Sequence, residues 1–379
     1  MVNYVFLSVY FYSVPNLRFT NNQLKDFKIV DICKLKQGNQ YDLKQQFTEE
    51  KSDLKRFIRI IDYTQKTNDI RYVYSNGSEN YVDCTDVVVV RYGASAGYVG
   101  RGINGIIANN LFTIRPINSA LLNKSYLYHY LNAPVIQKQL NNTQSSGMPA
   151  LNFQTINNLH ILLPEYQEQR QIAVFLDKID ERIQTQIKII DDYNSLKMGI
   201  YNCMFKENYA DYKLKQLAYI VKGDQINNDQ LLSNGSYYMM NGGASPSGYL
   251  DSYNVSENTI SISEGGNSCG YVQFNSSPFW SGGHCYTIQN VNSALIENKY
   301  LYHYLKYKEK EIMNLRIGTG LPNIQKKDLE NFTILVPSLL IQRKNLALFE
   351  MLDEKISILN EELANLQKQK KYLLCNMFI

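Results

Sequence analysis

The residues of this sequence that could do chemistry gather in and around three Gly-rich turns, GASAGYVGR (93–101), GGASPSG (242–248) and EGGNSCG (264–270). None has a GxGxxG pattern followed by a helix, so no dinucleotide site is predicted. The turns are compatible with ordinary hairpins, and equally with loops whose backbone approaches a nucleic-acid backbone closely. In the second case, nearby side chains would supply charge, stacking and hydrogen bonds to base edges. The candidates for DNA binding there are Arg91, Ser95, Tyr98, Arg101, Asn109, Ser245, Ser247, Asn267, Tyr271 and His284.

Two further turns, SSGMP (145–149) and GTGLP (318–322), each precede an expected short helix. Ser145, Ser146 and Thr319 could hold phosphate oxygens at the N-terminus of such a helix. Helix capping without any ligand explains these residues equally well.

Motifs of catalysis are absent from the sequence. It has no GxxxxGK[ST] phosphate loop, no GxSxG, no HExxH and no Pro-Pro pair, which excludes the usual signature of an amino-methyltransferase. His129 and His303 recur in two copies of YLYHYL, where packing of an aromatic helix face explains them better than catalysis. The six cysteines form no CxxC pair, so we expect reduced thiols, no metal and no cofactor.

The elements that hold these turns in place include long helices, which a heptad stripe of apolar residues predicts. Residues 163–205 contain one glycine and, after the opening Leu-Pro, no further proline, and their apolar residues recur every three and four positions. The same stripe returns 173 residues later, and the interruption at Lys197 returns as Lys370. The predicted helix–helix interface consists of Ile172, Leu176, Ile179, Ile183, Ile190, Phe349, Leu352, Ile356, Leu359, Leu363 and Leu366.

The rest of the chain is also written twice. DFKIVDICKLKQGNQ (26–40) aligns with DYKLKQLAYIVKGDQ (211–225), and VVVVRYGASAGYV (87–99) aligns with ISISEGGNSCGYV (260–272). Between these matching segments lie stretches that differ in length and content, 41–85 and 226–258. The sequence therefore predicts a duplicated framework that carries two different inserts.

We predict a mixed α+β fold in which two α/β globules are separated by two long antiparallel helices that form a coiled coil with pseudo-twofold symmetry. The expected parts are an N-terminal arm (1–25), a first target-recognition domain (26–162), a first spacer helix (163–206), a second target-recognition domain (207–335) and a second spacer helix (336–379). Folding of each helix back onto its own globule is the alternative.

Bulk properties set the compartment and the partners. The chain has 379 residues and a net charge of +4, which permits a polyanionic partner without requiring one. The apolar N-terminus lacks the basic region of a signal peptide and the ~20 apolar residues of a membrane span. We therefore expect a cytoplasmic protein that does not contact a membrane.

The sequence predicts two variable globules, each followed by a long helix that begins with a proline and a Gln-Arg pair. This plan resembles the specificity (S) subunit of type I restriction–modification enzymes. LPEYQEQRQIAVFLDKIDERI (163–183) carries the resemblance most clearly, and GGASPSGYLDSYN (242–254) with the paired Gly-Tyr-Val turns supports it. The likeness covers roughly residues 26–379. The second helix opening departs from the pattern, because it lacks a glutamate before Gln342.

The resemblance implies a non-catalytic subunit that binds double-stranded DNA. Each globule would recognise one half of a bipartite, asymmetric site, and the helices would set the spacing and dock two methyltransferase subunits. Motor/nuclease subunits would join through the complex. Globules on one side of the duplex would bind half-sites about 10 bp apart, centre to centre. A two-headed protein-binding scaffold without DNA specificity is the alternative function.

Overall fold

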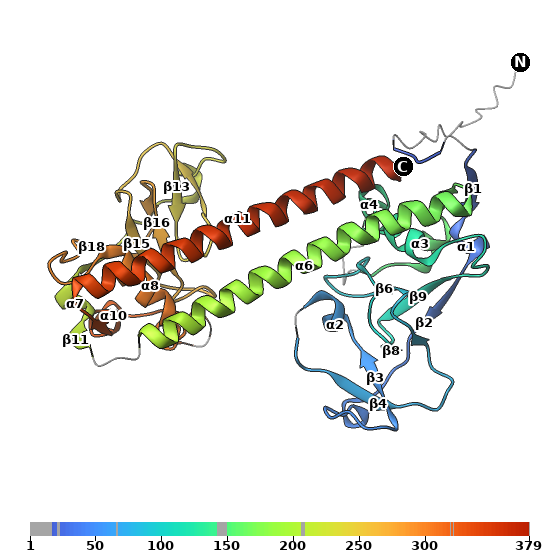
Figure 1. Cartoon of the computed structure of the whole chain (residues 1–379), viewed down its shortest axis with the longest axis horizontal. Helices are drawn as coiled ribbons and strands as arrows, with labels where there is room; N and C mark the ends of the chain where they lie inside the picture. The colour runs from blue at the N-terminus through green and yellow to red at the C-terminus, as the bar shows by residue number, and fades with distance from the viewer. Residues whose placement is uncertain are drawn as a thin grey trace, which may run out of the picture. The chain divides into compact units, whose positions relative to one another are not determined.

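The computed structural model describes residues 17–20, 23–65, 67–141, 150–205, 209–318, 320 and 322–378. The chain divides into two compact units: unit 1 comprises the residues up to Ile187 together with Glu361–Ile379, and unit 2 comprises Lys188–Asn360. Each unit therefore contains one β-rich globule, about half of the long helix α6 (Tyr166–Met204) and about half of the long helix α11 (Leu339–Met377) (Figure 1). Among the described residues, no helix has the length and apolar character that crossing a membrane requires.

The globule of unit 1 contains two four-stranded sheets and a ribbon. The first sheet has the antiparallel order β2 (Cys33–Gln37), β9 (Leu111–Pro116), β6 (Val87–Val90) and β7 (Val99–Gly100). The second has the order β4 (Arg71–Tyr74), β3 (Leu54–Ile58), β8 (Gly105–Ile107) and β5 (Tyr81–Val82). The ribbon pairs β1 (Lys25–Lys28) with β10 (His160–Leu163). The helices are α1 (Ile29–Ile32), the 3₁₀ turn η1 (Leu43–Gln45), α2 (Ile60–Thr64), α3 (Lys124–Leu131), α4 (Pro134–Asn141) and α5 (Phe153–Asn157).

The globule of unit 2 repeats this plan. Its main sheet has the antiparallel order β12 (Tyr219–Lys222), β18 (Cys285–Gln289), β15 (Thr259–Ser263) and β16 (Val272–Asn275). A second sheet has the order β14 (Gly248–Leu250), β13 (Tyr237–Met240) and β17 (Trp280–Ser281), and a ribbon pairs β11 (Ala210–Lys213) with β19 (Thr333–Val336). The helices are α7 (Leu214–Leu217), the 3₁₀ turn η2 (Asn228–Gln230), α8 (Asn298–Tyr307), α9 (Glu309–Met313) and α10 (Lys326–Glu330).

The two variable stretches also share a topology, although their sequences differ. In each, an antiparallel hairpin lies beside a short strand that follows the matched Gly-Tyr-Val segment, and the first strand of the hairpin runs parallel to it. Phe57 lies opposite Ile106 in unit 1, and Met239 lies opposite Trp280 in unit 2. The longer insert of unit 1 adds α2 and β5. The variable stretches are therefore different surfaces on a common frame.

One glycine in each unit permits the crossing from the main sheet to the second sheet. A Cβ atom on Gly38 would lie 2.2 Å from the Ala108 carbonyl oxygen, and one on Gly223 would lie 2.3 Å from that of Ser281. No larger residue fits this approach of two backbones. Glycine is therefore required at the aligned positions Gly38 and Gly223.

The long helices pack in antiparallel directions, as predicted. In unit 1 Gln186 donates to Glu362 (2.9 Å) and Lys370 donates to Asp180, so positions rise along α6 as they fall along α11. In unit 2 Lys197 donates to Asp353. Of the predicted stripe, Ile172, Leu176, Ile183, Ile190, Phe349, Leu352 and Leu359 are buried, whereas Ile179, Ile356, Leu363 and Leu366 are partly buried.

The ends of the long helices also pack on the globules. Ile172 and Leu176 of α6 share a core with Leu374 and Met377 of α11 and with the globule of unit 1. Tyr201 of α6 and Phe205, the residue after α6, share the core of unit 2 with Phe349 of α11. The helices pack on each other instead of each folding back onto its own globule, and each globule core takes in the first turns of one long helix and the last turns of the other.

The interruptions of the stripe are polar contacts that fix its register. Lys197 and Lys370 are equivalent under the 173-residue repeat, and so are their partners Asp353 and Asp180. The exposed fraction of the side chain is 14% for Lys197 and 19% for Lys370. A partly buried charged group at a core position favours the one alignment that supplies its partner.

A buried glutamine joins each long helix to the preceding globule. Gln169 donates to the carbonyls of Leu121 and Pro164 and accepts from the Asn123 amide, each at 3.0 Å. Gln342 makes the equivalent three bonds at 2.8 Å, so the Gln of each helix opening has the same structural role.

The missing glutamate of the second helix opening also has a structural reason. Glu168 accepts hydrogen bonds from Arg18, from the hydroxyl of Thr20 and from the amides of Phe19 and Thr20. Ile341 stands at the equivalent position. Glu168 thus binds the N-terminal segment 17–20, which precedes the first copy of the repeat.

Candidate nucleic-acid interface

The Gly-rich turns of the two units are built by the same backbone hydrogen bonds. In unit 1 the amide of Gly97 donates to the Val90 carbonyl (2.9 Å) and the amide of Val90 donates to that of Tyr98 (2.9 Å). In unit 2 Gly270 donates to Ser263 (2.8 Å) and Ser263 donates to Tyr271 (3.0 Å). Each turn therefore leaves its strand at an identical point of the frame, and side chains there can be compared position by position.

In unit 1 the residue that follows β6 is Arg91. Its Nη1 donates to Oε1 of Gln37 (2.8 Å), and its guanidinium lies 4.4 Å from the ring centroid of Phe153 and 4.8 Å from that of Tyr92. Gln37 in turn donates to the Asn109 carbonyl (2.6 Å). Gln37, Tyr92 and Asn109 are exposed, so this cluster presents an arginine between aromatic rings and amides.

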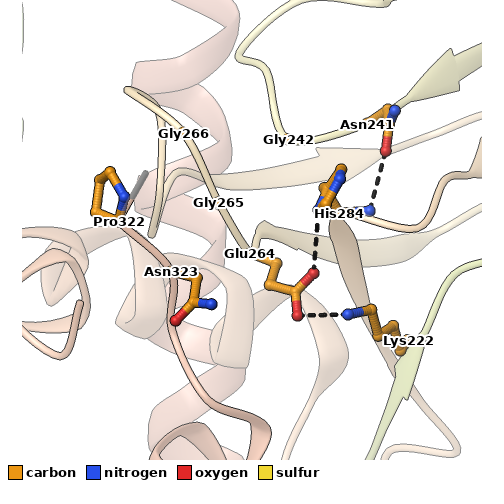
Figure 2. Close-up of a pocket in the computed structure, with 9 residues that line it drawn as sticks. All are labelled: Lys222, Asn241, Gly242, Glu264, Gly265, Gly266, His284, Pro322 and Asn323. Atoms are coloured by element: carbon orange, nitrogen blue, oxygen red, sulfur yellow. Dashed lines mark hydrogen bonds and ion pairs between the residues drawn. The ribbon is translucent and has the colours of Figure 1, made fainter. Parts of the chain in front are cut away.

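In unit 2 the equivalent pair is an ion pair, with a carboxylate where unit 1 has the arginine. Glu264 replaces Arg91 and Lys222 replaces Gln37, and the lysine donates to Oε1 of the carboxylate (2.6 Å). The Tyr286 hydroxyl donates to the same oxygen (3.0 Å), and Nδ1 of His284 lies 3.5 Å from Oε2 (Figure 2). The neighbouring carboxylate and burial together raise the pKa of Tyr286, with burial the larger cause.

A hollow of about 400 Å³ opens in front of this pair in unit 2. It is lined by the end of β12, by the Gly-rich turn after β15, by the residues after β13 and by the residue before β18. The residues are Lys222, Asn241, Gly242, Glu264, Gly265, Gly266, His284, Pro322 and Asn323. The lining combines cationic, anionic and amide groups with three glycines. Such a surface is better suited to hydrogen bonds with the polar edge of a base than to contacts with an apolar ligand.

The sequence-predicted candidates of unit 1 fall into three places. Arg91 and Asn109 lie in the cluster described above. Ser95 and the exposed Tyr98 lie on the Gly-rich turn. Arg101 is held by α6, since it donates to Asp177 (2.5 Å) and to Ser125 (2.7 Å) and lies 3.9 Å from the ring centroid of Tyr128. Its guanidinium is therefore already engaged within unit 1.

The candidates of unit 2 are spread over the hairpin and the turn. Ser245 and Ser247 are exposed between β13 and β14, and Asn267 is exposed on the Gly-rich turn. The ammonium group of Lys306 lies 4.1 Å from the ring centroid of Tyr271. His284 lines the hollow, and the candidates Ser145, Ser146 and Thr319 lie outside the described residues.

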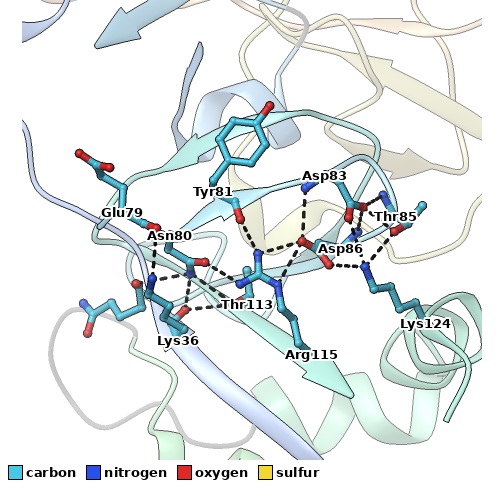
Figure 3. A network of polar contacts seen from close by, with 11 residues as sticks. Lys36, Glu79, Asn80, Tyr81, Asp83, Thr85, Asp86, Thr113, Arg115 and Lys124 are labelled. Atoms are coloured by element: carbon cyan, nitrogen blue, oxygen red, sulfur yellow. Dashed lines mark hydrogen bonds and ion pairs between the residues drawn. The ribbon is translucent and has the colours of Figure 1, made fainter. Parts of the chain in front are cut away.

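A charged network in unit 1 ties the variable stretch to the frame (Figure 3). Arg115 donates to Asp86 (2.8 Å) and to the side chain of the fully buried Asn80 (2.8 Å). Lys124 donates to Asp86 (2.7 Å). Burial alone would raise the pKa of Asp86, but the hydrogen bonds from Arg115 and Lys124 hold it below its usual value. This network stabilises the insert and is not free to bind a ligand.

His129, Asp177 and Asp180 form the one group of potential metal ligands among the described residues. Nε2 of His129 lies 2.8 Å from Asp177, and Arg101 lies 2.5 Å from Asp177 and 3.7 Å from Asp180. The guanidinium already balances these carboxylates. Although burial would raise the pKa of Asp177, hydrogen bonds from His129, Arg101 and Ser125 lower it.

Sequence analysis did not single out Gln37, Lys222 or Glu264. The internal alignment could have found them, because it places Gln37 opposite Lys222 and Arg91 opposite Glu264. A reversal of chemistry at two aligned positions is a signal that neither copy gives alone.

Known proteins resemble this chain in both sequence and structure. The sequence model of the type I restriction modification DNA specificity domain matches residues 21–191 and again 206–368. A putative type I specificity subunit of Mycoplasma pneumoniae is 34% identical over 155 residues, which are 41% of this chain and 41% of that protein. The specificity subunit of the MjaVIII type I restriction enzyme of Methanocaldococcus jannaschii is 23% identical over 80% of each chain. The chain thus spans less than half of the length of the mycoplasma relative.

Solved structures share the fold. The S subunit of a type I restriction–modification system from M. genitalium has a TM-score of 0.65 at 20% identity, over 97% of this chain and 99% of that one. A chain from a type I restriction–modification assembly has a TM-score of 0.52 at 16% identity, over 96% and 98%. The fold prediction and the suspected family are confirmed, and the chain belongs to the family of type I restriction–modification DNA specificity subunits.

Proposed function

We propose that this chain reads a bipartite, asymmetric sequence in double-stranded DNA, with one globule for each half of the site. The observation that carries the proposal is the duplicated frame with unlike side chains at equivalent positions, Gln37–Arg91 in unit 1 and Lys222–Glu264 in unit 2. Two globules with the same backbone frame can bind the DNA backbone in the same orientation, while their different side chains select different bases. Recognition, rather than catalysis, is the part that a specificity subunit contributes.

We further propose that the long helices dock two methyltransferase subunits, which motor/nuclease subunits can join. Both helices expose large apolar side chains in their first four turns: Val174 and Phe175 on α6, and Leu340 and Met351 on α11. A hollow of about 580 Å³ lies beside the α6 pair and is also lined by Phe19. Exposed apolar side chains on a charged helix surface favour a protein partner over solvent.

Sequencing of DNA methylation in cells tests the proposal directly. Cells that express this chain with its methyltransferase partner should modify one split motif with two unrelated halves. Deletion of this chain should abolish methylation at that motif, and re-expression should restore it. Methylation that persists without the chain would contradict the proposal.

Binding across a salt series separates DNA recognition from a protein scaffold. Contacts to phosphates release counterions, so the binding constant of the complex for duplex DNA should fall steeply and linearly with salt on a logarithmic plot. The chain's net charge of only +4 makes a local contact surface, rather than overall charge, the source of that slope.

A further inference from the structure

We infer that the equivalent pairs Gln37–Arg91 and Lys222–Glu264 determine base choice at one equivalent position of each half-site. Unit 1 would select guanine there, and unit 2 would select a base that presents an exocyclic amino group in the major groove, cytosine or adenine. This inference rests on the proposed function and names residues that carry it.

The backbone around the two pairs is held by equivalent hydrogen bonds in the two units. The amide of Arg91 donates to the Asn110 carbonyl (2.8 Å), and its carbonyl accepts from Leu151 (2.8 Å). The amide of Glu264 donates to the His284 carbonyl (2.9 Å), and its carbonyl accepts from Ile324 (2.9 Å). One backbone position, held by equal bonds, thus carries an arginine in one copy and a glutamate in the other.

The unit 1 pair offers hydrogen-bond donors. A guanidinium has five N–H donors and no acceptor. Among the described residues, only Gln37 accepts from the Arg91 side chain, and the buried Nε has no partner there. Phe153 and Tyr92 hold the guanidinium in place at 4.4 and 4.8 Å. Guanine is the base that presents two adjacent acceptors, O6 and N7, in the major groove.

The unit 2 pair offers an acceptor. The side chain of Glu264 is only 10% exposed, and its Oε1 accepts from Lys222 and Tyr286. Its buried Oε2 makes no hydrogen bond among the described residues, although Nδ1 of His284 lies 3.5 Å from it, and Glu264 contributes to the lining of the hollow (Figure 2). Cytosine N4 and adenine N6 can donate to such an oxygen, whereas O6 and N7 of guanine would face like charge.

The test is selection of binding sites from random duplex DNA by the complex of the full chain with its methyltransferase subunits. The main variant combines Lys222→Gln with Glu264→Arg, which transfers the unit 1 pair into unit 2. One position of the second half-site should change from cytosine or adenine to guanine, with the first half-site unchanged. Affinity for the original site should fall about 10- to 100-fold, the range of one specific base contact. Whether the original base is cytosine or adenine follows from the wild-type selection.

Glu264→Gln provides a second variant that keeps the shape of the side chain. An amide can donate as well as accept, so discrimination against guanine at that position should weaken. The matched control is Lys308→Gln with Glu311→Gln, a charged pair of the same globule whose atoms lie 2.7 Å apart and which lies outside the hollow. This control should select the wild-type site.

The outcomes separate the inference from the proposed function. If the wild-type complex selects a split site but both Glu264 variants keep the original base preference, the inference is wrong and the function stands. If the double variant is unfolded by circular dichroism, unchanged discrimination by Glu264→Gln alone is enough to overturn the inference. A wild-type complex that selects no sequence would overturn both.

Discussion

His129 on α3 and His303 on α8 occupy equivalent positions of the repeat, and both rings are buried, with 0% and 2% of the residue exposed. Burial, aided by the charge of Lys197, lowers the pKa of His303 to about 3. Burial also lowers the pKa of His129, although its hydrogen bond to Asp177 opposes the shift. Nδ1 of His303 shares a hydrogen bond with the Tyr201 hydroxyl (2.7 Å). These histidines are neutral core residues that pack the aromatic helix of each globule.

The lowered pKa of His303 predicts a loss of stability in acid. Between about pH 6 and pH 4 the unfolded chain binds a proton at this ring and the folded chain does not. The free energy of unfolding therefore falls as pH falls through the unfolded pKa, by about 1.4 kcal/mol per pH unit for one such group. His303→Gln can keep a hydrogen bond to Tyr201 without binding a proton.

Urea unfolding of wild type and His303→Gln at a series of pH values measures this difference. The slope of the unfolding free energy with pH should be shallower in the variant by about one proton. His129 is unchanged in both proteins and serves as the internal reference. Equal slopes would mean that His303 is protonated in the folded protein.

At the residue scale, sequence alone located part of the candidate site. Arg91 and Asn109 were predicted, and the structure brings them together through Gln37. Arg101 was predicted too, but its ion pair with Asp177 joins residues 76 positions apart, which no local pattern reveals. Glu264 was missed because a lone acid after a strand gives no sign that burial and Lys222 will surround it.

The heptad stripe allowed the two long helices to be predicted from sequence. The first begins at Tyr166, two residues after Pro164, and the second begins at Leu339, one residue after Ser338. The apolar pattern could not show that the helix ends enter the globule cores, because burial against a globule and burial against a helix use the same residues. Lys197 and Lys370 looked like defects in sequence, and their aspartate partners became visible only in the fold.

The two Lys–Asp pairs predict a charge-exchange experiment on the helices. Lys197→Asp or Asp353→Lys alone places like charges together and should destabilise unit 2, by about 1–3 kcal/mol for partly buried groups. The exchange of both residues should recover most of that loss. A double-mutant cycle by urea unfolding gives the coupling energy.

A matched pair on α6 provides the control for that cycle. The side chains of Lys178 and Glu181 form an ion pair of 2.7 Å, but they are 70% and 66% exposed. Their coupling should lie near the 0–1 kcal/mol of a surface pair. If the coupling energy between Lys197 and Asp353 is no larger than that of this control pair, the two residues do not set the helix register.

At the scale of the whole chain, duplication explains why two different surfaces share one frame. Gly38 and Gly223, Gln169 and Gln342, and the two Lys–Asp pairs are frame residues with equal roles in both copies. The repeat made this frame predictable from sequence. The sequences 41–85 and 226–258 share no pattern, so their common sheet topology could not be predicted from them.

We also propose that the length of the two long helices sets the spacing of the two half-sites, as the family resemblance implies. Inserting seven residues in each helix, in register with the heptad stripe, adds two turns and about 10 Å at 1.5 Å per residue. The spacer between the half-sites should then widen by about 3 bp at 3.4 Å per step. An insertion in one helix only should shift the register and destabilise the protein.

The most direct measurement is therefore the methylated motif of wild type and of the variant with both insertions, each expressed with its methyltransferase partner. We expect two unrelated half-sites in both proteins, with the same bases and a spacer about 3 bp longer in the variant. Two half-sites that are copies of one sequence, or a spacer that does not change, would contradict it.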